Sequence, residues 1–416
     1  METTVDAADH NAEPYARAAP PLALYAHFPW CVRKCPYCDF NSHRRTETID
    51  QAGYITALLR DLRRDLAAFE DGHDARELGS IFLGGGTPSL FGADAIADLL
   101  RGIGDHLAFA SDIEITLEAN PGALEHDAFA AYRAAGVNRL SLGVQSFDDA
   151  QLRRLHRIHG ADDARRAMRA ARDGGFDNIN IDLMHGLPGQ DAAAATRDLD
   201  AALELAPSHV SLYQLTIEPN TWFHRHPPRL PDDDCILRTQ RALQNQARAR
   251  GYRRYEVSAH AQPGRECRHN LNYWRFGDYL GIGAGAHGKI TRGGAITRYW
   301  KPKHPRAYLQ HTMDENANAN ANANGGGGRH EVAADEVLFE FLLNALRLTD
   351  GFDTGLIRAR TGCDTGDALA LLDDAIAQRL IRVDGARVRC SEKGYRLLDE
   401  ILQEILPQSQ SQPQPQ

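Results

Sequence analysis

The sequence lacks the features that mark a membrane-spanning, exported or nucleic-acid-binding protein. None of its apolar runs, in a chain of 416 residues, reaches the roughly 18 residues that a membrane span requires. Residues 1–21 are polar, acidic and alanine-rich, without the apolar stretch of a secretory signal, so we expect a disordered leader there. The net charge of −9 gives no basic excess and argues against a nucleic-acid partner. These absences predict a cytoplasmic protein without a transmembrane segment.

Cysteine is also scarce, and its distribution excludes a disulfide framework. The chain has seven cysteines, an odd number, and three of them stand in the stretch CVRKCPYCDF at positions 31, 35 and 38. In a chain without an export signal, grouped thiols indicate metal or redox use. Thiolates are soft ligands that suit an iron–sulfur cluster or zinc.

The two metals make different demands on this loop. A structural zinc site needs a fourth ligand, for which His27, Asp39 and His43 are candidates. A cluster of four irons held by three cysteines keeps one iron without a protein ligand, open for a substrate or cofactor. The loop alone does not decide between them.

Between residues 22 and 219, short apolar runs alternate with stretches of helical period. This alternation predicts right-handed βαβ units and a parallel sheet. Six units fit a partial or complete βα barrel, which we assign to residues 22–260, although a doubly wound open sheet is compatible with the same pattern. The apolar runs cover residues 22–28, 80–86, 113–119, 139–145, 178–184 and 210–216.

The remainder of the chain predicts a second, smaller domain. Residues 331–405 contain amphipathic helices at 336–348 and 367–380 and a hairpin around Asp384-Gly385, which predicts a winged-helix-like α+β domain. Acidic residues outnumber basic ones there, so we expect a packing or interaction role and not DNA binding. Three further segments complete the division: an aromatic- and glycine-rich segment at 261–313, a flexible low-complexity insertion at 314–330 and a disordered tail at 406–416.

Polar and glycine residues close consecutive predicted strands. The sequence GGGTP at 84–88 closes the second strand, Glu118 and Asn120 the third, Gln145 the fourth and Asp182 the fifth, and the cysteine loop follows the first. A single such residue is commonly a turn or a cap. Five strands in succession indicate a ligand site, because βα barrels build their sites at the carboxyl ends of strands, and glycines let a ligand approach backbone N–H groups.

Five motifs in order, YAHFPWCVRKCPYCDF, FLGGGTPS, LEANPG, LGVQSF and NIDLMHGLPGQ, resemble the radical S-adenosylmethionine (SAM) superfamily. The resemblance covers residues 22 to about 400 and is strongest to the branch of oxygen-independent coproporphyrinogen-III dehydrogenase. It implies a partial (βα)6 barrel in which Cys31, Cys35 and Cys38 ligate a [4Fe–4S] cluster and SAM fills the open iron. In that superfamily the reduced cluster splits SAM into methionine and a 5′-deoxyadenosyl radical. The motif positions imply SAM contacts from Tyr25, Tyr37, Gly85, Gly86, Thr87, Glu118, Gln145, Arg157 and Asp182.

Two departures from the dehydrogenase pattern point to a sister group. The dehydrogenase has a fourth cysteine where this chain has Phe40, and its N-terminal substrate-recognition region is shortened here to the leader. Both departures match the HemW-type heme chaperones. A second signature of that group, H-N-x-x-Y-W, stands here as HNLNYW and implies heme contacts from His269, Asn270, Tyr273 and Trp274.

The chemistry of this motif agrees with heme. A neutral histidine nitrogen is a common axial ligand of heme iron, and flat aromatic rings pack well on a porphyrin face. His269 is therefore the leading ligand, with Cys267 and with His287 of GAGAHG as further candidates. Without the signature, a histidine beside tyrosine and tryptophan is more often a core residue.

The resemblance implies a heme chaperone that passes heme to recipient apo-hemoproteins and meets a membrane only through such recipients. The alternative is a dehydrogenase that decarboxylates coproporphyrinogen III to protoporphyrinogen IX. A third reading is a zinc-dependent DNA-binding regulator. Phe40 and HNLNYW favour the chaperone, and under that interpretation we expect no dehydrogenase activity.

Overall fold

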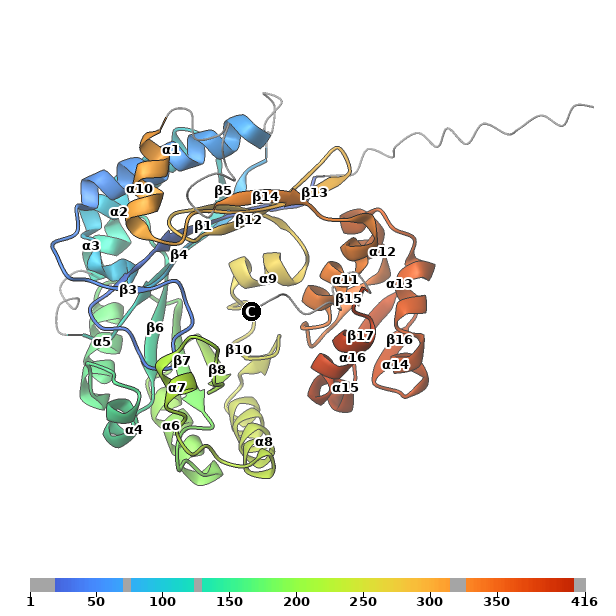
Figure 1. The fold of residues 1–416 in the computed structure, drawn as a ribbon. Helices are drawn as coiled ribbons and strands as arrows, with labels where there is room; N and C mark the ends of the chain where they lie inside the picture. The colour runs from blue at the N-terminus through green and yellow to red at the C-terminus, as the bar shows by residue number, and fades with distance from the viewer. Residues whose placement is uncertain (1–18, 70–75, 123–128, 315–326, 408–416) are drawn as a thin grey trace, which may run out of the picture.

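The computed structural model describes residues 19–69, 76–122, 129–314 and 327–407. A strongly curved sheet faces a smaller C-terminal domain across its concave side (Figure 1). The leader expected at 1–21, the insertion expected at 314–330 and the tail expected at 406–416 lie largely outside these residues. No helix within the described ranges is long and apolar enough to cross a membrane.

The sheet confirms the prediction of a partial (βα)6 barrel. Six strands, β1, β4, β5, β6, β7 and β8, lie side by side and parallel in their order along the chain. A doubly wound sheet would reverse its order at one point, and this one does not. Each predicted apolar run overlaps one of these strands: β1 (Leu22–Phe28), β4 (Leu78–Gly85), β5 (Phe109–Ala119), β6 (Arg139–Gln145), β7 (Ile179–His185) and β8 (His209–Gln214).

The sheet continues on both sides of the barrel strands. On one side β11 pairs parallel with β1, and β12 to β14 follow antiparallel; on the other, β10 pairs antiparallel with β8, and β9 with β10. The segment expected at 261–313 is therefore largely an extension of the barrel sheet. These strands are β9 (Arg253–Arg254), β10 (Ala259–Ala261), β11 (Asp278–Ile282), β12 (His287–Arg292), β13 (Ala295–Trp300) and β14 (Gly328–Glu331).

Strand β14 begins inside the stretch expected to be a flexible insertion. Gly328 pairs with Trp300 of β13, and a Cβ atom at Gly328 would lie 2.5 Å from the Trp300 ring. This glycine therefore permits a close strand pairing, which composition alone did not reveal.

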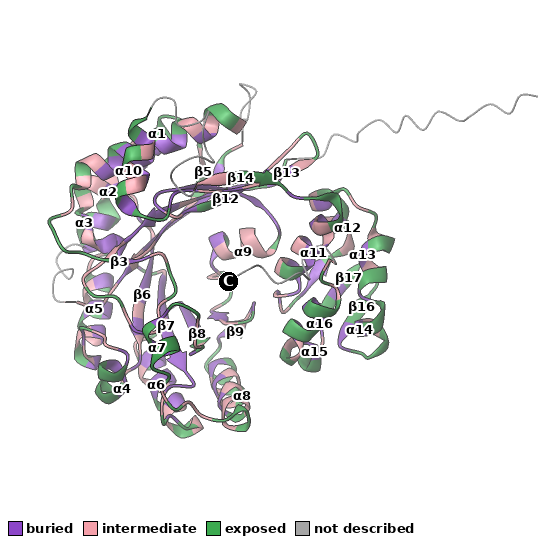
Figure 2. Cartoon of the chain, viewed as in Figure 1, coloured by how far each residue is buried: buried purple, intermediate pink, exposed green. Residues whose placement is uncertain are grey.

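Helices cover the outer, convex face of the sheet, and their inward sides are buried (Figure 2). In α5, Ala164, Ala167, Met168 and Ala171 are buried at helical spacing, and small side chains let the helix approach the strands. The carboxylate of Asp163 accepts a hydrogen bond from the Gly160 N–H at the start of this helix. The helices outside the C-terminal domain are α1 (Gln51–Phe69), α2 (Ala93–Gly104), α3 (Phe129–Ala134), α4 (Asp149–Arg154), α5 (Ala161–Asp173), α6 (Ala192–Glu204), α7 (Trp222–Arg225), α8 (Asp233–Ala249), α9 (Arg268–Trp274) and α10 (Pro305–Met313).

The barrel strands alternate between an apolar outer row and a polar inner row. In β7, Ile179, Ile181 and Leu183 belong to the main core, whereas Asn180 and Asp182 line an inner cavity. Because the helices supply apolar partners only on the convex side, the concave side is free to carry polar side chains. Helix α9 lies on this concave side and contacts β4 (Figure 1).

The C-terminal domain packs helices against a three-stranded sheet. The hairpin expected around Asp384-Gly385 is present, with Gly385 at φ +60° between β16 (Ile381–Asp384) and β17 (Arg387–Cys390). The helix predicted at 367–380 is interrupted at Leu372 (φ −100°, ψ 1°), whose side chain is buried in the core of the domain. The other elements are α11 (Ala334–Ala345), β15 (Phe352–Asp353), α12 (Thr354–Thr361), α13 (Thr365–Leu371), α14 (Asp373–Ala377), α15 (Glu392–Arg396) and α16 (Leu398–Glu404).

Candidate functional site

The three clustered cysteines follow β1 on a loop at the carboxyl end of the barrel. Cys31 ends the short strand β2 (Trp30–Cys31), which pairs with β3 (His43–Arg44), and the Cys38 N–H donates to the Cys35 carbonyl. Each sulfur has its own polar neighbour, and such contacts stabilise thiolate ligands of an iron–sulfur cluster. The neighbours are the Thr87 hydroxyl, 3.6 Å from Cys31 Sγ, Arg157 Nη1, 3.4 Å from Cys35 Sγ, and the Ser42 hydroxyl, 3.6 Å from Cys38 Sγ.

These cysteines open into a cavity of about 470 Å³, which we call the cysteine cavity. All but one of the residues expected to contact SAM line it, and so does Asn270 of the HNLNYW motif. Tyr25 is the exception: it lines a neighbouring cavity, and its hydroxyl lies 3.0 Å from His27 Nδ1. The expected residues in the cysteine cavity are Cys31, Cys35, Cys38, Tyr37, Gly85, Gly86, Thr87, Glu118, Gln145, Arg157 and Asp182.

The glycine loop after β4 is tied to the cysteine loop by its backbone. The Gly86 N–H donates to the Phe28 carbonyl, and a Cβ atom at Gly86 would lie 2.5 Å from the Trp30 carbonyl oxygen. Gly85 has φ +112°, a backbone conformation that favours glycine. The uncovered backbone of this glycine loop lies beside the three thiols. This arrangement fits a ligand that contacts the backbone and also the open iron of a cluster held by the thiols.

Arg157 connects the glycine loop after β4 to β6, the fourth strand of the barrel. Its guanidinium contacts Cys35, the side chain of Asn120 and the Gly143 carbonyl, while Asn120 Nδ2 donates to the Thr87 hydroxyl at 2.9 Å. The strand-end rule predicted Asn120 but not Arg157, which follows α4; the motif resemblance alone supplied it. Gln145 also lines the cavity, at φ +72°, a strained conformation of the kind found at ligand sites.

A zinc site has no geometric support here. Both ring nitrogens of His27 are engaged, Nδ1 with the Tyr25 hydroxyl and Nε2 with the Asn41 carbonyl, and His43 Nε2 lies 3.2 Å from Asn41 Oδ1. Within the described ranges, no three His, Cys, Asp or Glu side chains are arranged to hold a single metal ion.

Sequence reasoning missed a row of polar residues deeper in the barrel. Arg139, Asn180 and His209 also line the cysteine cavity on the concave side, and the Asn180 side chain connects Ser141, Asp182 and His209 through hydrogen bonds. Attention to strand ends overlooked them because they stand at the beginnings of strands. Polar residues within otherwise apolar runs were the available signal.

A second cavity, of about 650 Å³, adjoins the cysteine cavity. The two share Asp39, Phe40, Ser42, Gly85 and Glu118 as lining residues. The second cavity also combines aromatic rings, histidines and lysines from the cysteine loop, from α9 and from the strands after it: Tyr25, His27, Lys34, His43, Tyr273, Tyr279, His287 and Lys303.

The HNLNYW motif forms α9, and its members face three surroundings. His269 is only 2% exposed; Asn270 lines the cysteine cavity and Tyr273 the second cavity. Trp274 lies under the Arg347 guanidinium of the C-terminal domain, 4.3 Å from its ring centre. The motif therefore joins both cavities to the C-terminal domain.

His269 has an environment of its own on the inner face of the barrel. Its Nδ1 lies 3.1 Å from the Ser80 hydroxyl, and its Nε2 is buried without a hydrogen-bond partner among the described residues. Burial, followed by the nearby Arg139, lowers the pKa of His269 to about 3, so the ring is neutral. Tyr273 packs edge-on against this ring, with the ring centres 4.9 Å apart.

Comparison with known proteins places the chain in a family. The radical SAM superfamily profile matches residues 25–201, and the HemN C-terminal domain matches residues 332–397. The heme chaperones HemW of Haemophilus influenzae and of Escherichia coli are both 46% identical to it, over 93% of this chain and 98% of theirs. The chain belongs to the HemW family. The structure of coproporphyrinogen III oxidase (HemN) from Escherichia coli has a similar fold, with a TM-score of 0.76 at 23% identity over 94% of this chain and 91% of that chain.

Membership of the HemW family, within the radical SAM superfamily, implies a [4Fe–4S] cluster and SAM, and the residues of the cysteine cavity fit both. The three cysteines would hold the cluster, which supplies electrons to SAM when both are bound. Among the expected SAM contacts, Glu118 is a carboxyl group whose pKa is strongly raised. Burial, followed by the charge of Asp182, raises the pKa of Glu118 to about 8, although its carboxylate accepts the Gly85 N–H.

We expect the affinity of this HemW-family protein for SAM to increase with pH. Below the pKa of about 8 the Glu118 carboxyl is neutral; above it, its negative charge attracts the sulfonium group of SAM, whose charge does not depend on pH. Affinity should rise about tenfold between about pH 6.5 and about pH 9, measured by equilibrium dialysis of the reconstituted protein. Glu118→Gln should remove this slope, and the exposed control Glu47→Gln should keep it. An unchanged slope in Glu118→Gln would assign the titration to another group.

Proposed function

We propose that this protein is a heme chaperone that binds heme beside its cluster and SAM cavity and transfers it to recipient apo-hemoproteins. Two proteins named heme chaperone HemW share 46% identity with nearly its whole length. The observation that carries the proposal is the second cavity, because its lining unites the groups that a heme needs and because it shares a wall with the cysteine cavity.

Two kinds of side chain in the second cavity match parts of heme. The rings of Phe40, Tyr273 and Tyr279 provide flat apolar surface for a porphyrin face. Lys34 and Lys303 provide ammonium groups for the propionates. Phe40, at the position of the dehydrogenase's fourth cysteine, is 65% exposed on the shared wall, and a heme would cover it.

We propose His269 as the iron ligand. It is neutral, its Nδ1 is held by Ser80, and its Nε2 has no partner, which is the arrangement of an imidazole fixed by one nitrogen and available through the other. The Tyr273 ring stands against it and also lines the second cavity, so a movement of Tyr273 would open the way. His287 is the structural alternative, because it is exposed and already lines that cavity.

A heme titration of the anaerobically reconstituted protein, followed by its Soret band, tests the function and the ligand together. We expect saturable binding of about one heme per chain, and a dissociation constant raised at least about tenfold in His269→Ala. Iron and sulfide of the cluster should stay unchanged in that variant. His106→Ala, an exposed histidine away from the site, is the matched control.

Two outcomes would contradict parts of this proposal. Weakened binding in His287→Ala but not in His269→Ala would move the ligand to His287. Absence of saturable binding in the unmodified protein would remove the heme function itself. Transfer is tested separately, by mixing the heme-loaded protein with an apo-hemoprotein and measuring recovery of the recipient's activity.

A further inference from the structure

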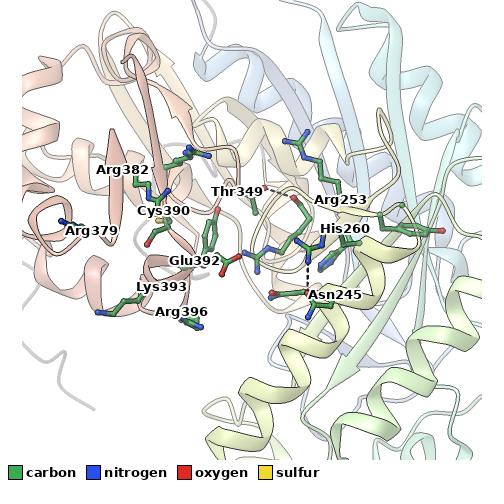
Figure 3. A pocket seen from close by; sticks show the side chains of 18 residues that line it. Asn245, Arg253, His260, Thr349, Arg379, Arg382, Cys390, Glu392, Lys393 and Arg396 are labelled. Carbon is green, nitrogen blue, oxygen red and sulfur yellow. Dashed lines mark hydrogen bonds between the residues drawn. The ribbon is translucent and has the colours of Figure 1, made fainter. Parts of the chain in front are cut away.

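A basic cleft lies between the barrel and the C-terminal domain and shares no lining residue with the cysteine cavity (Figure 3). We use the name basic cleft for this cavity of about 960 Å³. The end of α8, the following turn and β10 form one wall, with Asn245, Arg253 and His260; the C-terminal domain forms the other, with Arg382 and Lys393 among its residues (Figure 3).

The lining carries a large excess of positive charge, although the whole chain has a net charge of −9. Eight cationic side chains line the cleft, and among its described lining residues the only carboxylate is Glu392. Seven of the eight are arginines, whose planar guanidinium binds phosphate and carboxylate groups through two parallel hydrogen bonds. The cations are Arg248, Arg253, Arg254, Arg379, Arg382, Arg389, Lys393 and Arg396.

Ion pairs within the protein account for only part of this charge. Arg253 pairs with Asp350, and Arg389 with Asp384 at 2.8 Å, both at the surface. In the described parts of the chain, Arg379, Arg382 and Arg396 form no ion pair. Like charges gathered without counter-charges repel one another, and an anion in the cleft would relieve that repulsion.

Two side chains in the cleft, one buried and one half-buried, have few polar partners within the described residues. His260 is 2% exposed, and within the described residues only a weak contact with the Ser258 backbone reaches its buried ring nitrogens. The half-buried Arg254 guanidinium stacks over the Tyr395 ring at 4.8 Å and has no ion pair within the described residues. Unpaired buried polar groups are rare in proteins and indicate a missing partner.

We propose that the basic cleft is a binding site for a compact polyphosphate, such as the triphosphate of a nucleotide. The shape of the cleft separates this class from other anions. A flat membrane surface does not fit this cleft, because its cationic side chains lie on two facing walls, one from each domain. A triphosphate carries several negative charges on one compact group, which matches the many cations of the cleft. A single carboxylate carries only one negative charge. The proposal is independent of the heme function.

A ligand in the cleft would contact both domains at once. Thr349 lines the cleft from the C-terminal side, and its hydroxyl donates to the Arg254 carbonyl of the barrel at 2.8 Å. Two residues earlier, Arg347 covers Trp274 of α9. A bound polyphosphate would therefore stabilise the contact between the two domains, and this contact includes the packing of Arg347 on Trp274 of α9.

Isothermal titration of the full-length reconstituted protein with sodium tripolyphosphate and, separately, with ATP tests the proposal. We expect saturable binding of one tripolyphosphate per chain. Arg254→Gln and Arg382→Gln should each raise the dissociation constant about tenfold, as should His260→Ala. The control is Arg101→Gln, which removes the same charge from an exposed pair on α2. It should bind as the unmodified protein does.

Each arm of the experiment has a decisive outcome. Equal binding of tripolyphosphate and ATP, or tighter binding of ATP, supports the proposal, since both ligands present the same phosphates. Absence of saturable binding, or binding unaffected by all three cleft variants, overturns it. Binding of duplex DNA that is lost in Arg382→Gln, with no binding of tripolyphosphate, also overturns it, because the cleft would then serve a macromolecule. Because Arg382 is exposed, its variant should fold even if that of Arg254 does not.

Discussion

Replacing Cys35 with alanine is expected to give a folded protein that holds no [4Fe–4S] cluster. The three cysteines are the only thiols that line the cysteine cavity among the described residues, so no other thiol there can substitute. Bound iron should fall from about four atoms per chain to fewer than about one, measured by iron and sulfide analysis after anaerobic reconstitution. The fold should survive, because Arg157 retains Asn120 and the Gly143 carbonyl as partners.

The chain offers a matched control for this substitution. Cys235 is a free cysteine on α8 that lies outside both the cysteine cavity and the second cavity. Cys235→Ala should keep its full complement of iron and sulfide. Retention of the cluster by Cys35→Ala would contradict the ligand assignment. If Cys35→Ala shows an altered circular dichroism spectrum, Cys38→Ala separates loss of the cluster from loss of the fold.

Replacing Lys301 with methionine is expected to give the largest loss of stability. The Lys301 ammonium is buried between two carboxylates, 2.6 Å from Asp61 Oδ1 and 2.5 Å from Asp65 Oδ1. Burial, partly offset by Lys301, raises the pKa of Asp65 to about 7. Without the cation, two buried carboxyl groups would face each other, which should lower the free energy of unfolding by about 3–5 kcal/mol. Urea denaturation measures this loss.

The carboxylates themselves supply the control for Lys301. A triple variant, Lys301→Met with Asp61→Asn and Asp65→Asn, removes the uncompensated charge and should recover part of the lost stability. A loss below about 1 kcal/mol in the single variant would show that water reaches the site. The buried group of Lys301, Asp61 and Asp65 also positions the loop before β12, because Asp61 accepts the Gly283 N–H at 3.1 Å. Heme binding in the second cavity, whose lining includes His287 at the start of β12, should therefore be more sensitive to this variant than SAM binding.

The sequence predicted the barrel well because its local signals agree with its packing. Apolar runs of strand length recur between helical stretches, and β1 and β6 begin and end at the predicted residues. The winged-helix-like hairpin followed from the same agreement, since Gly385 supplies the positive φ of its turn. The break at Leu372 was missed because the core of the domain, and not helical periodicity, decides it.

The site was predictable only in part. Strand-end position and motif together found the cysteine cavity, because parallel strands bring their carboxyl ends to one edge. They could not show that Tyr25 belongs to the second cavity, or that His269 is covered by Tyr273. Such facts depend on side-chain directions within the curved sheet. The basic cleft was also beyond prediction, because its arginines come from two domains far apart in the sequence.

The core of the C-terminal domain includes side chains that the barrel sheet supplies. Phe276 and Ile296 are buried among its helices, and Trp274 lies beneath Arg347. A chain that ended before Val332 would expose these three apolar side chains to water, and exposed apolar surface promotes aggregation. We therefore expect exchange of the C-terminal part between relatives to succeed only if the residues around Phe276 change with it.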